Sequence, residues 1–139
     1  MKTAYPIIDA DGHVLEKDSE LHEFLEAGSG WIPYMMDRMD EEFEKPQRRQ
    51  APLLKKKPSE TIRSGQVWAT CEVGEKALPQ VIRQFNPRCL MWPSDYPHER
   101  LPDMFKRDIP EFLARADLSD EEKRLILYEN PKKFYGLEI

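Results

Sequence analysis

The sequence predicts one α/β domain built on a parallel sheet. Short apolar runs that suit buried strands are separated by longer segments whose apolar residues recur at helical spacing. Strands that alternate with helices favour parallel pairing, because each helix carries the chain back to the start of the next strand. The length of 139 residues fits a single domain that covers the whole chain.

Four segments are expected to form strands. The first ends in a polar turn, Asp11-Gly12-His13, and the last is a continuous apolar run that suits a strand buried on both faces. That last run ends at Pro93, and the polar string Ser94-Asp95-Tyr96-Pro97-His98 follows it. In chain order the expected strands are Tyr5–Ala10, Phe24–Ala27, Val67–Cys71 and Cys89–Trp92.

Helical spacing and end signals predict the helices between and after these strands. Pro110 is expected in the first turn of its helix, and Ser119 with Glu122 forms a capping box that opens the last one. Three prolines and a lysine run predict a loop over Lys45–Gly65. The expected helices are Trp31–Glu44, Glu75–Phe85 with an interruption at Pro79, Pro110–Ala116, and a last helix from Ser119 that Asn130-Pro131 stops.

Composition excludes several classes of protein. Acidic residues outnumber basic ones by 26 to 21, so nucleic acid is not an expected partner. No apolar run approaches the roughly 20 residues of a membrane span, and neither a membrane nor a secretory leader is expected. Two cysteines, Cys71 and Cys89, are too few for a disulfide framework. We therefore expect a cytoplasmic protein whose cysteines are small buried hydrophobic residues.

Two polar clusters at strand ends could do chemistry. Asp11 and His13 are two residues apart, so on an extended chain their side chains point the same way, as does that of Asp9. A carboxylate beside an imidazole is half of a metal site, and a capped strand end is the structural alternative. Asp95 and His98 follow the last strand, where parallel sheets bind ligands. The alternative there is a capping aspartate and a solvated histidine.

The residues that carry a family resemblance are spread over most of the chain. Ile8–Glu16 is similar to the opening strand of the amidohydrolase-2 family, the relatives of aminocarboxymuconate-semialdehyde decarboxylase. Phe24–Tyr34 with Arg38-Met39-Asp40 resembles its sixth strand and the helix after it. Later segments resemble the family in the same order: Lys57-Pro58-Ser59-Glu60, Met91–His98, Glu129-Asn130-Pro131 and Phe134-Tyr135-Gly136-Leu137.

The resemblance implies a (β/α)₈ barrel with a divalent metal ion at its mouth. Asp11 and His13 match the first-strand ligand pair of the family. Asp95 matches the eighth-strand aspartate, which contacts the metal and shuttles the proton of the metal-bound water. Zinc is the expected ion, with manganese, iron and nickel as alternatives.

The chain departs from the family pattern in its middle. It passes from residues similar to the first strand (1–22, with a short link) directly to equivalents of strands six to eight (23–139), and the fifth-strand histidine ligand has no counterpart. The expected fold is therefore a truncated (β/α)₈ barrel with about four parallel strands per chain. Two bare edges then predict a homodimer, or a higher even oligomer, that closes the ring. Asp95 of one chain would approach Asp11 and His13 of its partner.

Further candidates surround this expected site. Glu26 on the second predicted strand is a candidate base or additional ligand, and a strand-end carboxylate paired with a lysine or arginine is the alternative. His22 and His98 are candidate replacements for the missing ligand, and each is otherwise a surface histidine. Trp31 and Tyr34 are candidates to line a substrate pocket, although aromatic residues more often belong to the core.

The expected function is metal-dependent hydrolysis of a small organic ester, lactone or amide, with Asp95 as general base. One alternative is metal-dependent, non-oxidative decarboxylation of an aromatic or unsaturated acid. The other is a non-catalytic remnant that acts as a binding or scaffold module, which the missing histidine favours and the retained Asp11, His13 and Asp95 oppose.

Overall fold

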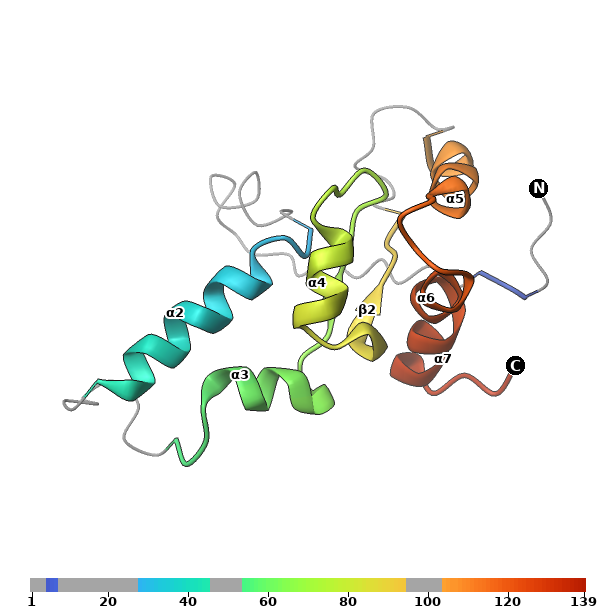
Figure 1. Cartoon of the computed structure of the whole chain (residues 1–139). Coiled ribbons are helices and arrows are strands. Elements are labelled where there is room, and N and C mark those ends of the chain that lie inside the picture. Colours follow the sequence, from blue (N-terminus) through green and yellow to red (C-terminus); the bar gives the residue numbers. More distant parts are fainter. Residues whose placement is uncertain (1–4, 8–27, 46–53, 95–103) are drawn as a thin grey trace, which may run out of the picture.

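The computed structural model of the chain describes residues 5–7, 28–45, 54–94 and 104–139, with the backbone alone at 104 and 105. In Figure 1 the strand β2 (Leu90–Met91) runs between the helix α4 (Leu78–Gln84) on one side and the pair α6 (Asp120–Arg124) and α7 (Asn130–Tyr135) on the other. Half of the first expected strand, residues 8–10, and all of the second lie outside the described residues. The described half, Tyr5–Ile7, does not form a strand, so the prediction is wrong there.

The described strands form a parallel pair, as the sequence predicts. β1 (Ala69–Thr70) pairs with β2 so that Ala69 lies opposite Leu90 and Thr70 opposite Met91. The N–H of Cys71 adds a hydrogen bond of 2.9 Å to the carbonyl of Met91. Both strands are shorter than expected. β2 begins one residue late because the chain just before it forms the 3₁₀ turn η2 (Pro87–Cys89), where the Asn86 side chain accepts the N–H of Arg88.

The helix α2 (Ile32–Glu44) confirms the prediction made from its apolar spacing. Ile32 and Met36, four residues apart, are buried on the side that faces the core. Arg38 forms exposed ion pairs with Glu41 and Glu42 on the other side. The helix thus covers the core with one face and meets water with the other.

The expectation of a loop throughout Lys45–Gly65 is wrong over its second half. The helix α3 (Pro58–Thr61) begins at a proline and continues as a π-helical turn, η1 (Ile62–Gln66). Proline lacks the N–H that the first turn of a helix leaves unbonded, so Pro58 starts this helix instead of preventing it. Gly65 has a φ of 94°, a left-handed conformation that favours glycine, and the chain leaves the turn there.

Two further helices differ from prediction at their prolines. The helix α4 begins at Leu78, and Pro79 lies in its first turn, so the expected interruption is absent. The helix α5 (Met104–Ala114) contains Pro110 in its interior instead of beginning there. An interior proline cannot donate a helical hydrogen bond, and helices that contain one are bent or weakened at that point.

The last helical region begins at the predicted capping box and runs past the predicted end. The Ser119 hydroxyl accepts the N–H of Glu122, and the Glu122 carboxylate accepts the N–H of Ser119. The chain then passes from α6 through the π-helical turn η3 (Leu125–Glu129) into α7. Pro131 therefore lies at the start of a new helical turn, and the chain leaves the helix at Gly136, whose φ is 65°.

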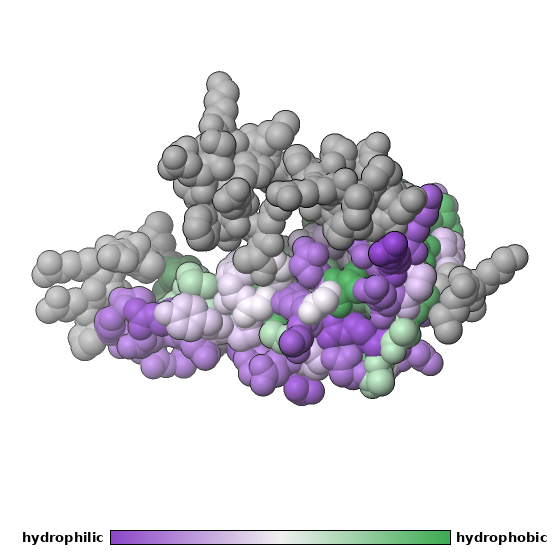
Figure 2. All heavy atoms as spheres, turned by 90° about the horizontal axis from the view of Figure 1, so that it is seen from above, coloured by the Kyte–Doolittle hydropathy of each residue, from purple (hydrophilic) through white to green (hydrophobic). Residues whose placement is uncertain are grey.

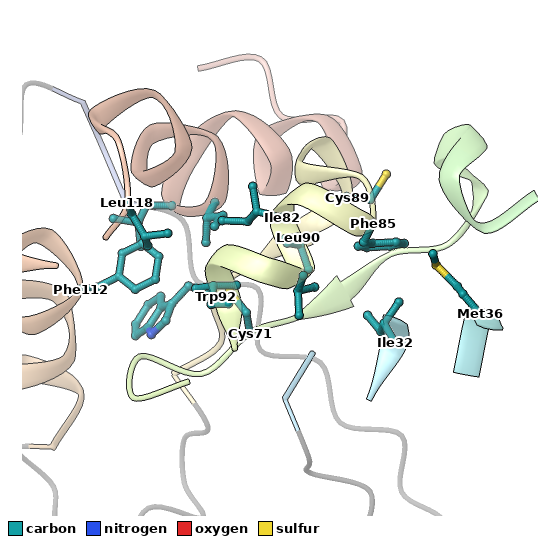
Figure 3. Packing of buried hydrophobic residues seen from close by; sticks show 14 residues of the cluster. Ile32, Met36, Cys71, Ile82, Phe85, Cys89, Leu90, Trp92, Phe112 and Leu118 are labelled. Atoms are coloured by element: carbon teal, nitrogen blue, oxygen red, sulfur yellow. The ribbon is translucent and has the colours of Figure 1, made fainter. Parts of the chain in front are cut away.

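One buried apolar cluster joins these elements. Figure 3 shows Ile32 and Met36 at one end of the cluster and Phe112, Leu118 and Trp92 at the other. Cys71 and Cys89 are free thiols buried within it, which confirms their predicted role. In Figure 2 the visible face of the described residues is mostly hydrophilic, with small separate hydrophobic areas. No described helix combines the length and the apolar character that crossing a membrane requires.

Candidate functional site

The carboxyl ends of β1 and β2 meet at one edge of the sheet, because the two strands are parallel. The chain leaves β1 through Cys71 and the turn before α4, and it leaves β2 through Trp92 and Ser94. Trp92 and Ser94 are both buried. Asp95, the next residue, lies outside the described residues, so the structure places the chain up to the residue before it. We call this edge the carboxyl edge.

Glu75 ties the carboxyl edge to the segment that precedes α2. Its carboxylate accepts the Ser29 hydroxyl at 3.0 and 2.9 Å, the Ser29 N–H at 3.1 Å and the Glu72 N–H at 3.4 Å. Ser29 is fully buried. A Cβ at Gly28, whose φ is 57°, would stand 3.0 Å from the Glu75 carboxylate, so this close approach requires glycine.

Arg115 also holds this turn. Its Nη1 donates to the carbonyl of Val73 at 2.9 Å, while Nε and Nη2 donate to the two Asp117 oxygens at 3.0 and 2.7 Å. The hydrogen bond to Asp117 raises the pKa of Arg115, and the same contact lowers the pKa of Asp117. The turn after β1 is thus fixed between the chain before α2 and the chain after α5.

The strand β2 is held by the last helical region. The Asn130 side chain, 2% exposed, donates to the carbonyls of Pro87 and Leu90, both at 2.7 Å. The Trp92 N–H donates to the carbonyl of Ile126 at 3.4 Å. These contacts fix the chain on both sides of β2, which is the strand that leads to Asp95.

Six of the predicted site residues lie outside the described residues: Asp11, His13, His22, Glu26, Asp95 and His98. The two predicted pocket residues are described and belong to the start of α2. Trp31, directly before that helix, is 49% exposed, and Tyr34 is 66% exposed. They are therefore not core residues, and their role as pocket residues stays a prediction.

The candidate metal ligands fit a divalent ion by their chemistry. Two carboxylates and one imidazole, from Asp11, Asp95 and His13, are ligands that zinc, manganese and iron accept, and three protein ligands leave a position open. Within the described residues there is no group of three His, Cys, Asp or Glu side chains that could hold a metal ion.

Sequence reasoning missed the side chains that fix the carboxyl edge: Ser29, Glu75, Arg115 and Asn130. Ser29 bonds to a residue 46 positions away, and Asn130 to one 40 positions away. No local pattern reports such pairs. One signal was present, because a serine between two glycines suggests a close backbone approach.

Comparison with protein families adds one decisive observation. The family model described as Amidohydrolase matches residues 24–137, which is most of the chain. The chain belongs to the amidohydrolase family. A search of curated proteins finds no match to the chain.

Membership in the amidohydrolase family indicates an enzyme of hydrolase or decarboxylase type. The family fold is generally a TIM barrel, and its members typically bind a divalent metal ion. The matched residues include Asp95 and leave Asp11 and His13 before their start. The parallel pair β1–β2 and its flanking helices are the kind of α/β structure from which such a fold is built.

Proposed function

We propose that this amidohydrolase-family chain is a metal-dependent hydrolase that acts on a small organic ester, lactone or amide. The family match is the observation that carries the proposal. The matched residues include the segment Met91–His98, which begins at the last residue of β2 and contains Asp95. The parallel pairing of β1 and β2 supports it, since ligands of parallel α/β folds bind at the carboxyl edge.

Three residues have assigned roles in this proposal. Asp11, His13 and Asp95 hold the divalent ion, for which zinc is the first choice. When bound, the ion polarises the substrate carbonyl and lowers the pKa of a water molecule toward about 7. Asp95 accepts the proton of the attacking water and returns it to the leaving group, as a general base and then a general acid.

The proposal extends to the subfamily and to assembly. We place the chain with the relatives of aminocarboxymuconate-semialdehyde decarboxylase, as an internally shortened form that passes from the first strand to the sixth. Two copies, or a higher even number, then complete the barrel. Each site combines Asp95 of one chain with Asp11 and His13 of its partner, and a small molecule is the substrate.

Metal content, measured on the purified protein, is the first test. We expect about one divalent ion per chain, and we expect Asp95→Asn to lose it. Asp37→Asn, which changes an exposed carboxylate on α2, is the matched control and should keep the ion. A protein that holds no metal and whose stability is unchanged by chelation would identify a non-catalytic remnant.

Turnover distinguishes the reaction classes. On a panel of esters, lactones and amides, we expect hydrolysis that a chelator abolishes and that Asp95→Asn lowers by roughly 10²-fold or more. Release of carbon dioxide from aromatic or unsaturated acids, without hydrolysis of any ester, lactone or amide, would replace the hydrolase by the decarboxylase. No turnover of either kind by metal-loaded protein would contradict both.

A further inference from the structure

The edge of the sheet opposite the carboxyl edge carries a group of exposed aromatic side chains. Because β1 and β2 are parallel, their amino ends meet at this edge, which we call the amino edge. Trp68 lies directly before β1, and its ring centroid is 5.2 Å from that of Phe134 on α7. Phe134 in turn meets the ring of Tyr135 edge-on at 5.0 Å. Val67, Phe134 and Tyr135 are 37, 48 and 44% exposed, so water meets an apolar surface here.

Two exposed cations lie beside these rings. The Nζ of Lys133 stands 5.7 Å from the centre of the Trp68 ring. Burial raises the pKa of the Cys89 thiol, and the positive charge of Lys133 opposes that rise. Arg88 is the residue before Cys89 and is exposed in η2. Lys133 and Arg88 therefore both lie near the residue that leads into β2.

The turn η1 brings a third exposed cation, Arg63, to the same edge. Its Nε donates to the carbonyl of Gln84, the last residue of α4, at 2.7 Å, and the Asn86 side-chain amide donates to the Arg63 carbonyl at 3.0 Å. A Cβ at Gly65 would lie 3.9 Å from the sulfur of Cys89, so η1 also approaches η2 closely. In Figure 1 the end of α4, the continuation of α3 into η1, and α7 all lie along the lower side of the view.

The charge of these three cations is not neutralised by ion pairs. Within the part of the chain that the structure describes, Arg63, Arg88 and Lys133 form no ion pair with a carboxylate. Cations on other parts of the described surface are in ion pairs: Arg38 with Glu41, Arg115 with Asp117, and Arg124 with Glu129. The net charge of the chain is −5, so the positive charge of the amino edge is a local feature.

We propose that the amino edge is a docking surface for an acidic segment of another protein, one that carries apolar side chains among its carboxylates. Arg88, Lys133 and Arg63 pair with the carboxylates of that segment. The exposed rings of Phe134 and Tyr135 cover its apolar side chains. Aromatic residues and arginine are the residues that most often dominate the binding energy of protein interfaces.

Two other occupants fit the amino edge less well. Nucleic acid bases stack on free ring faces, whereas the Trp68 ring has Lys133 over it and Phe134 beside it. The negative net charge of the chain also repels a long polyanion. A second copy of the chain would have to supply carboxylates, and those of Glu42 and Glu44 on α2 already pair with lysines of their own chain.

Fluorescence anisotropy of a labelled peptide in which glutamate alternates with leucine tests the proposal on the full chain. We expect saturable binding that weakens about tenfold or more as sodium chloride is raised from about 0.05 M to about 0.5 M. A peptide with lysine in place of each glutamate should not bind. A peptide with serine in place of each leucine should bind about tenfold more weakly, because it offers no apolar side chains to the rings. No binding of the glutamate–leucine peptide, or equal binding of either comparison peptide, would overturn the proposal.

Charge reversal locates the binding surface. Arg88→Glu and Lys133→Glu should each weaken binding of the glutamate–leucine peptide about tenfold or more. The matched controls are Arg107→Glu on α5 and Lys76→Glu in the turn before α4, which change exposed cations away from the amino edge and should leave binding unchanged. Circular dichroism checks that each variant is folded, and if one charge reversal unfolds the chain, the other decides. Equal weakening by the controls would overturn the proposal, because only the total charge would then matter.

Two further measurements identify a different occupant. Single-stranded DNA with the same number of negative charges should bind more weakly than the glutamate–leucine peptide. Tighter binding of the DNA, lost in Arg88→Glu, would assign the amino edge to nucleic acid and overturn the proposal. Light scattering should give Arg88→Glu and Lys133→Glu the same mass as the wild type. A lower mass for both variants would assign the amino edge to a second copy of the chain, which also overturns the proposal.

Discussion

At the scale of single residues, Glu75 shows how hydrogen bonds stabilise a partly buried carboxylate. Two N–H groups and one hydroxyl donate to it, and the hydroxyl and one N–H belong to Ser29, which is fully buried. A buried donor that loses its acceptor costs about 1–3 kcal/mol, because water cannot replace the bond. The same contacts order the turn after β1, so one side chain serves both stability and the shape of the carboxyl edge.

Glu75→Ala should therefore lower the free energy of unfolding by about 2 kcal/mol, because it leaves both Ser29 donors without an acceptor. Urea denaturation followed by circular dichroism measures the change. Glu41→Ala is the control, since Glu41 pairs with Arg38 on the exposed side of α2 and should cost less than about 0.5 kcal/mol. Equal losses for the two variants would contradict the role given to Glu75.

At the scale of elements, prolines within the described residues begin helices more often than they end them. Pro58 and Pro79 each occupy a first turn, where the missing N–H has no helical partner to lose. Pro131 lies near the start of α7, which continues directly from η3. The short helix α3 needs further support, and Asp40 of α2 supplies it by accepting the N–H of Ser59 at 2.9 Å and its hydroxyl at 2.6 Å. The two helices are thereby joined through one carboxylate.

The Asp40 contact predicts a specific pH dependence. Partial desolvation opposes ionisation, but the hydrogen bonds from Ser59 outweigh it, so the pKa of Asp40 lies below its ordinary value of 3.8. A lowered pKa in the folded state means that the stabilisation is fully present above pH 3.8 and is lost as the pH falls through the folded pKa.

Asp40→Asn should accordingly reduce the free energy of unfolding at pH 7 by about 1 kcal/mol, with the deficit shrinking as the pH falls below about 3.8. Urea denaturation at a series of pH values measures both effects. Asp37→Asn, on the exposed part of the same helix, should show neither. A deficit of Asp40→Asn that is constant with pH would exclude the ionised carboxylate as its cause.

At the scale of the whole molecule, the central question is how an amidohydrolase fold is completed. The described residues contain a two-stranded parallel sheet, whereas the family fold is generally a barrel of eight parallel strands. Unpaired strand edges invite association with other strands. Our proposal closes the ring with a second copy, which also brings Asp95 to Asp11 and His13 of the partner.

Light scattering after size exclusion should therefore give a mass of twice 16.4 kDa, or a higher even multiple, at micromolar concentration. Mixing two inactive variants, Asp95→Asn and His13→Ala, supplies a sharper test. If each site is shared, half of the sites in a mixed dimer carry both changes and the other half carry neither, so activity returns on mixing. A stable monomer with full activity would end the shared-site proposal and leave the family assignment intact.

Local sequence patterns predicted much of the helical structure and the sheet pairing. The apolar spacing of α2 and the capping box at Ser119 depend on residues within one or two helical turns, so a short segment contains all the information. Parallel pairing of β1 and β2 followed from the alternation of strands and helices. Local patterns did not predict where α5 begins or where α7 ends, because a proline starts, bends or stops a helix according to its surroundings.

By itself the sequence determined the α/β class, the buried cysteines and, through its resemblance, the amidohydrolase family that the family match then showed. Only the tertiary structure decided how the carboxyl edge is held. Glu75 meets Ser29 across 46 residues, and Asn130 meets Leu90 across 40. Hydrogen bonds depend on distance and direction in space, and the folded packing of the core, not spacing along the chain, brings these pairs together.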